Sequence, residues 1–199
     1  MTATVTATME KPVLFLNPTL WRTCKMLAGI KRVRLLRQLY EHAGRCVSDL
    51  GSAVGIKRAY ASQELRRIQS RGLLKAARCG RPLIYRLEAD PQVPSAAPLL
   101  KAIQSALRLH PASCDPDMCA IANGLAHERR MAIAQTIMEH PCSLPDLQMQ
   151  LHLSPFGLAQ HLRSLEKSGF AEREGALVSF KVPPHPLART LADLLKQAK

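Results

Sequence analysis

Basic and amide side chains are concentrated between residues 57 and 86 of this 199-residue sequence. Guanidinium groups can form paired hydrogen bonds with guanine, and glutamine amides can do the same with adenine. Basic side chains also bind the phosphates that position a protein on a duplex. The candidate DNA-contacting residues of this segment are Lys57, Arg58, Ser62, Gln63, Arg66, Arg67, Arg78 and Arg81. The segment therefore predicts a surface that binds double-stranded DNA.

This basic segment belongs to a unit that occurs twice, because residues 27–87 are echoed by residues 125–182. The matched pairs are Leu27-Ala28 with Leu125-Ala126, Leu65-Arg66 with Leu162-Arg163, and Gly72 with Gly169. A repeat of this length is a whole small domain rather than one turn of a solenoid. We therefore predict an arm at 1–17, a first domain at 18–110 (copy one), a linker at 111–117 and a second domain at 118–199 (copy two).

The apolar spacing is the same in both copies and predicts the same elements. Ala61, Leu65 and Ile68 follow helical spacing, and the matching apolar residues of copy two are Leu158, Leu162 and Leu165. Each copy is predicted to form two helices, a short helix, a tight turn, a further helix and a β-hairpin. Gly72 and Gly169 are expected to end the longer helix in a left-handed conformation. The hairpins are expected at 73–87 and 170–182.

Capping residues and prolines give the expected starts of the other helices. The predicted N-caps or first residues are Asn17 before Pro18, Ser48, either Ser143 or Pro145, and Ser154 before Pro155. A proline-rich stretch at 90–98 is predicted to be a stiff linker before a closing helix at 99–109. The matching terminal helix is expected at 187–197. This order of elements predicts a mainly α fold with small β-hairpins (α+β), arranged as two winged helix-turn-helix domains in tandem, each hairpin being a wing.

The two copies differ in the side chains that are expected to face outward. The candidate DNA-contacting residues of copy two are Ser154, Gln160, His161 and Arg163, and its hairpin carries Glu172 and Glu174. Acidic side chains repel phosphate, so copy one is the stronger candidate for DNA binding. Copy two is expected either to bind DNA weakly or to act as a dimerisation or partner module.

Three motifs of copy one resemble the ArsR-type winged-helix regulators. They are the run Cys46-Val47-Ser48-Asp49-Leu50, the helix motif Ala61-Ser62-x-x-Leu65, and the hairpin motif Gly80-Arg81-x-x-x-Tyr85-Arg86-Leu87. The run from Leu158 to Phe170 resembles the same family in copy two. The resemblance covers about sixty residues of each copy and implies a transcriptional regulator, usually a repressor, in bacteria or archaea. Members are normally single-domain homodimers that pair through their first and last helices, whereas this chain carries two units.

The sequence predicts no metal, cofactor or catalytic site. Metal-sensing ArsR-type proteins use a Cys-x-Cys pair, whereas here Cys46 is followed two residues later by Ser48. Soft metals need several converging thiolates or imidazoles, so a metal site would need help from Cys114, Cys119 or His110. We expect the six scattered cysteines to be separate thiols, with a redox role for Cys46 or Cys79 as an alternative. No paired carboxylates or nucleophile motif suggest an enzyme.

Charge and hydropathy point to a location beside nucleic acid. Residues 1–95 carry 17 Lys/Arg against 6 Asp/Glu, and residues 96–199 carry 11 against 9. Nearly all of the net charge of +13 therefore lies in the first half, which suggests a polyanionic partner. No apolar run is long enough to cross a membrane and no secretory signal is evident, so we expect a cytoplasmic, nucleoid-associated protein.

Two assemblies and two other functions remain open at this point. The terminal helices are expected to pack the two copies together within one chain, forming an intramolecular pseudo-dimer, or to pack two chains into a homodimer. A tandem winged-helix module for protein interaction or chromosome architecture is the first alternative to a transcriptional regulator. A metal- or redox-gated ArsR-like sensor is the second.

Overall fold

The computed structural model describes residues 19–80 and 82–198, which are mainly helical with two small antiparallel sheets. The predicted fold class, mainly α with small β-hairpins, is confirmed. The predicted arm at 1–17 and the predicted helix start at Asn17 and Pro18 lie outside the described residues. Within the two described ranges, every helix is too short or too polar to cross a bilayer.

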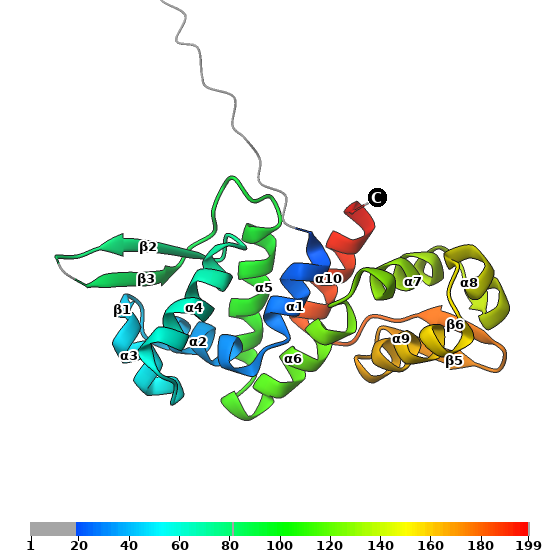
Figure 1. The fold of residues 1–199 in the computed structure, drawn as a ribbon, viewed down its shortest axis with the longest axis horizontal. Helices are drawn as coiled ribbons and strands as arrows, with labels where there is room; N and C mark the ends of the chain where they lie inside the picture. The colour runs from blue at the N-terminus through cyan, green and yellow to red at the C-terminus, as the bar shows by residue number, and fades with distance from the viewer. Residues whose placement is uncertain (1–18, 81, 199) are drawn as a thin grey trace, which may run out of the picture.

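The two halves of the chain repeat one order of elements (Figure 1). Copy one consists of α1 (Leu20–Leu27), α2 (Ile30–Glu41), β1 (Arg45–Cys46), α3 (Val47–Val54), α4 (Arg58–Gln69), β2 (Leu74–Arg78), β3 (Leu83–Leu87) and α5 (Ala96–Leu109). A 3-10 turn, η1 (Ala112–Cys114), joins the copies. Copy two consists of α6 (Asp115–Gly124), α7 (Glu128–Glu139), β4 (Cys142–Ser143), α8 (Leu144–Leu151), α9 (Pro155–Lys167), β5 (Ala171–Glu174), β6 (Leu177–Phe180) and α10 (Pro186–Gln197).

Several predicted helix ends are confirmed by their caps. The Ser143 hydroxyl accepts a hydrogen bond from the Asp146 amide at 3.3 Å and caps α8. The Ser154 hydroxyl accepts one from the Gly157 amide at 3.2 Å and caps α9. Gly72 and Gly169 both adopt positive φ, at 73° and 76°, after α4 and α9. The local signals therefore fixed where these helices start and stop.

Other boundaries were predicted wrongly, mostly because proline fits the first turn of a helix. Helix α5 begins at Ala96 rather than at 99, and Pro98 lies in its first turn, so the predicted stiff linker ends as helix. Helix α6 begins at Asp115, inside the predicted linker at 111–117, with Pro116 as its second residue. Helix α3 begins at Val47 with Cys46 as its N-cap, one residue before Ser48.

Each hairpin gains a third strand that the sequence did not indicate. The sheet orders are β1-β3-β2 and β4-β6-β5, and all pairings are antiparallel. Arg45 pairs with Tyr85 in copy one, and Cys142 pairs with Val178 in copy two. A strand of two residues has no readable alternation, because side-chain periodicity needs several residues. The extra strand anchors each hairpin beside the start of the short helix.

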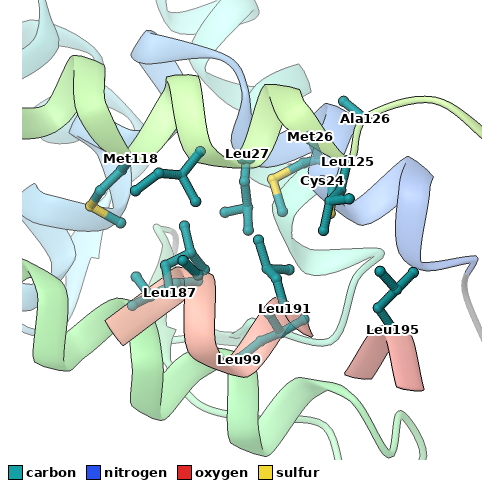
Figure 2. Packing of buried hydrophobic residues seen from close by; sticks show 14 of the residues in the cluster. Cys24, Met26, Leu27, Leu99, Met118, Leu125, Ala126, Leu187, Leu191 and Leu195 are labelled. Atoms are coloured by element: carbon teal, nitrogen blue, oxygen red, sulfur yellow. The ribbon is translucent and has the colours of Figure 1, made fainter. Parts of the chain in front are cut away.

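The two copies share one hydrophobic core rather than two separate ones. Helix α5 packs against α10, and α1 packs against α6, so the terminal helices of the copies meet along the middle of the molecule (Figure 1). Figure 2 shows Leu27 of α1, Met118 of α6 and Leu191 of α10 in this cluster, and all three are almost completely buried. The predicted packing of terminal helices within one chain is therefore what this fold adopts.

A buried ion pair also joins the copies. The Arg37 guanidinium of α2 donates to the Asp115 carboxylate at the start of α6, at 2.7 Å from Nη2 and 2.9 Å from Nε. It also donates to the carbonyls of Leu107 and His110 at the end of α5, at 3.2 Å and 3.1 Å. Arg37 and Asp115 are only 6% and 1% exposed, so water does not replace these bonds. One arginine thus fixes the end of copy one to the start of copy two.

Candidate nucleic-acid interface

Helix α4 of copy one presents most of the predicted DNA-contacting residues to solvent. Its inner face buries Ala61, Leu65 and Ile68 completely. On the opposite side, the exposed predicted residues are Lys57, Arg58, Gln63, Arg66 and Arg67, whereas Ser62 is half-buried. The helical spacing thus placed the apolar and basic faces as predicted.

The turn before α4 depends on one glycine. Gly55 follows α3 with a φ of 66°, a left-handed conformation that L side chains rarely adopt. Its amide and that of Ile56 bond back to the Ser52 and Gly51 carbonyls at the end of α3. These hydrogen bonds close the short turn that leads from α3 into α4.

A buried glutamate on α4 was not anticipated from the sequence. Glu64 is completely buried, and its carboxylate pairs with Arg32 of α2 and with Arg67 one turn further along α4, each at 2.5 Å. Arg67 is therefore partly engaged within the protein. Within the described residues, Arg58 and Arg66 form no hydrogen bond or ion pair, so they are the guanidinium groups of α4 that are free to meet a ligand. The available signal was the position of Glu64 beside Leu65, on the apolar side of the helix.

The β2–β3 hairpin of copy one projects away from the helices (Figure 1) and also carries basic side chains. Arg78 is exposed and pairs in register with Leu83 across the hairpin, while Lys75 lies opposite Arg86. Lys75 is held by Glu88 at 2.6 Å. Arg66 of α4 lies close enough to Tyr85 of β3 to affect the pKa of that phenol, which burial raises. Arg81, at the predicted wing tip, lies outside the described residues.

Copy two holds the same elements with a different outer face. Helix α9 exposes Gln160 and Arg163 as predicted, whereas the hydroxyl of the exposed Ser154 is already used as the N-cap. Phe156, in the first turn of α9, is 80% exposed, and Met149 of α8 is 71% exposed. These large apolar groups were missed because Phe156 lies outside the apolar spacing of Leu158, and exposure cannot be deduced from residue type.

His161, which was predicted to face outward on α9, is half-buried, and its contact with DNA stays a prediction. Its half-buried ring lies against that of His127 at the start of α7, with ring centroids 4.8 Å apart. Burial lowers the pKa of His161, and its electrostatic interactions with His127, Arg130 and Arg129 lower it further. The imidazole therefore belongs to the contact between α7 and α9.

The hairpin of copy two is acidic and internally paired. Glu172 accepts from Lys181 at 2.9 Å, and Arg173 reaches back to Glu166 of α9 at 3.3 Å. Glu174 is exposed at the end of β5. Such a surface offers phosphate little attraction, which agrees with the predicted difference between the copies.

The cysteines do not come together at a shared site. All six are free thiols. Across residues 19–80 and 82–198, no three His, Cys, Asp or Glu side chains are placed to hold a metal ion. Cys46 therefore lacks the second and third ligands that a gated metal sensor would need from the described residues.

Comparisons of this chain with protein-family models, with curated proteins and with solved structures found no match.

Proposed function

We propose that this protein binds double-stranded DNA in a sequence-specific way and regulates transcription through copy one. In this proposal, α3 and α4 form a helix-turn-helix, α4 enters the major groove, and the β2–β3 hairpin is a wing that follows the backbone. The observation that carries the proposal is the outer face of α4, where Arg58 and Arg66 are exposed and unpaired beside a basic hairpin. The resemblance of both copies to ArsR-type regulators supports it.

The fixed packing of the copies suggests how a single chain would meet DNA. Two winged-helix units held by one core would act as a pseudo-dimer and could span two half-sites about 34 Å apart, one turn of the duplex. Because α4 and α9 carry different outward side chains, the preferred site would be asymmetric, unlike the palindromes bound by true dimers. Association into a homodimer remains a prediction.

The exposed apolar residues of copy two favour a second function for that half. Phe156 and Met149 project from the elements that correspond to α4 and α3. Large exposed apolar groups often mark protein-interaction sites. In this alternative, copy one binds DNA while the α8–α9 face binds another protein.

The proposal is tested by measuring duplex binding across a salt series. The variant Arg58→Ala/Arg66→Ala removes the two free guanidinium groups without leaving buried Glu64 short of a partner, as replacing Arg67 would. We expect each arginine that binds a base to account for about 1–3 kcal/mol of affinity, and each that binds a phosphate to account for about 1 in the salt slope. Lys101→Ala/Arg108→Ala removes the same charge from exposed positions of α5 and serves as the control.

Three outcomes separate the possibilities. Loss of affinity in the α4 variant but not in the α5 control supports DNA binding through copy one. Equal losses in both variants, with no preference among duplex sequences, would reduce the activity to nonspecific attraction by net charge. Absence of binding at low salt would refute the proposal.

A further inference from the structure

An arginine on the second helix of each copy meets the longer helix of that copy. The two arginines differ in whether a carboxylate neutralises them. In copy one, Arg32 at the start of α2 donates from Nε to the Met26 carbonyl and from Nη1 to the Glu64 carboxylate. Its Nη2 also donates to the Lys25 carbonyl at 3.2 Å. The guanidinium is thus neutralised by a buried carboxylate supplied by α4.

The duplicated positions of copy two lack that carboxylate. Arg130 of α7 takes the place of Arg32, and His161 of α9 takes the place of Glu64. The Nε of Arg130 is buried without a hydrogen-bond partner in the part of the chain that the structure describes. A buried donor left unpaired is costly. The Nε atom is itself closed to solvent, but the Arg130 side chain is only half-buried, so a partner from outside the chain would reach the rest of the guanidinium group.

The surroundings of Arg130 are mainly cationic, although Glu128 also lies in the first turn of α7. His127 and His161 lie with ring centroids 4.8 Å apart, and His127, Arg130 and Arg129 all act to lower the pKa of His161 after burial. No carboxylate shifts this pKa in the opposite direction. Cys24 of α1 lies near Arg130, but burial raises the pKa of its thiol to about 12, so it remains uncharged at neutral pH. We name His127, Arg129, Arg130 and His161 the α7–α9 basic cluster.

The composition of the cluster suits an anion with several oxygens. His127 Nδ1 accepts from the Arg129 amide at 3.1 Å, which leaves its Nε2 as the protonated donor of the neutral ring. The cluster also lies at the start of α7, where the helix dipole favours negative charge. A carboxylate offers two oxygens and one charge, whereas phosphate offers more oxygens and up to two charges for these four groups.

We propose that the α7–α9 basic cluster is an oxyanion-binding site of copy two that takes a phosphate group where copy one uses its own Glu64. The site does not depend on the proposed DNA binding through copy one. Its phosphate could be a free anion or a phosphate of the DNA backbone, since both offer the same oxygens.

The first test uses inorganic phosphate as the probe, at pH 7 and constant ionic strength set with chloride. We expect saturable binding by calorimetry, and an upward shift of the His127 and His161 pKa values in NMR titrations. His161→Glu places in copy two the carboxylate found in copy one and should weaken phosphate binding at least about tenfold. Arg130→Gln should do the same by removing the unpaired guanidinium. Arg189→Gln, an exposed position of α10, is the charge-matched control and should bind normally.

The second test repeats the histidine titration with duplex DNA in phosphate-free buffer. An upward pKa shift of His161 with DNA would identify a backbone phosphate, whereas a shift with inorganic phosphate alone would identify a free anion. No saturable response of either ring to phosphate or to DNA would overturn the proposal, as would normal phosphate binding by a folded His161→Glu and a folded Arg130→Gln. The phosphate measurement needs no DNA, so failure of the proposed DNA binding leaves this result interpretable.

Discussion

Helices α4 and α9 occupy the same place in the two copies and bury the same side, yet their outer faces differ. Both bury apolar residues at matched positions, Leu65 in α4 and Leu162 in α9. Outside that register, α4 exposes free arginines, whereas α9 exposes Phe156 and carries a half-buried histidine that contacts His127. The packing of this unit therefore tolerates very different outer surfaces, and function must be assigned to each copy separately.

The attachment of the second helix to the last helix shows the same divergence. Arg37 of α2 donates to the Leu107 carbonyl of α5 at 3.2 Å, and Gln135 of α7 donates to the Leu195 carbonyl of α10 at 3.3 Å. Only Arg37 also holds a carboxylate, that of Asp115, across the junction of the copies. Copy one therefore supplies the arginine, and copy two the carboxylate, of the ion pair that joins the halves.

The largest expected effect comes from breaking the ion pair between Arg37 and Asp115. Asp115→Ala leaves the buried Arg37 with only the more distant carboxylate of the exposed Glu41, at 3.8 Å, and should lower the free energy of unfolding by about 3–5 kcal/mol. Gln135→Ala removes only the matching hydrogen bond from the side-chain amide to the Leu195 carbonyl and should cost about 1 kcal/mol. Urea unfolding of both variants measures the difference. Equal losses of unfolding free energy in the two variants would contradict the larger contribution that we assign to the Arg37–Asp115 ion pair. The double variant Arg37→Met/Asp115→Leu should recover much of the loss, because no charge is then left unpaired.

The next effect concerns the outer faces of α4 and α9. Arg66 and Arg163 occupy matched, exposed positions, so each can be removed without disturbing the core. We expect Arg66→Ala to weaken DNA binding by about 1–3 kcal/mol and Arg163→Ala to weaken it by less. Fluorescence anisotropy with one duplex at fixed salt provides the comparison. A larger loss for Arg163→Ala would reverse the roles proposed for the copies.

A smaller effect is expected at the turn between the short and the long helix. Gly55 has a φ of 66°, and its counterpart His152 has a φ of 49°, which makes it the one non-glycine with positive φ among the described residues. Left-handed backbone costs an L residue about 1–2 kcal/mol, although glycine loses more freedom on folding. His152→Gly should therefore stabilise the protein by up to about 1 kcal/mol, and Gly55→Ala should destabilise it by about 1 kcal/mol.

Thermal unfolding of these two variants sharpens the comparison. No atom lies within 4 Å of the Cβ that Gly55→Ala would add, so the expected loss reflects backbone conformation alone. An unchanged unfolding temperature for Gly55→Ala would contradict the dependence of this turn on a glycine at position 55.

The smallest effect is a pH dependence located in copy two. His185, the N-cap of α10, is buried and stacks on His110 with ring centroids 5.1 Å apart. Burial lowers its pKa, the nearby His110 lowers it further, and Asp117 opposes the shift. A lowered pKa in the folded state means that the unfolded chain binds the proton more tightly. Stability should therefore be complete above about pH 6.5 and should fall as the pH drops below that value.

His185→Asn tests this dependence while preserving the cap. The His185 Nδ1 accepts from the Leu187 amide at 3.1 Å, and an asparagine oxygen can accept the same bond. The variant should lose less stability than the wild type between pH 7.5 and pH 5.5. An unchanged slope would assign the pH dependence to other groups, of which His161 is the first to test, because its pKa is also lowered.

Most of the fold was predictable because it depends on local signals that occur twice. Apolar spacing located α2, α4, α7 and α9, and glycines and serines located several of their ends. The strands β1 and β4 could not be predicted, since two residues pair only because the hairpin lies beside them. The basic face of α4 was predicted from helical spacing, whereas the contact between the His161 and His127 rings was not.

The sequence by itself determined the duplicated unit, its helix and hairpin order, and the imbalance of charge between the copies, because spacing and composition are properties of the chain. Only the tertiary structure decided which charged groups are free. Glu64 engages Arg32 and Arg67, Asp115 engages Arg37, and Arg130 is left without a carboxylate. These partners lie up to 78 residues apart, and whether a charge is neutralised depends on what the fold brings within a few ångströms of it.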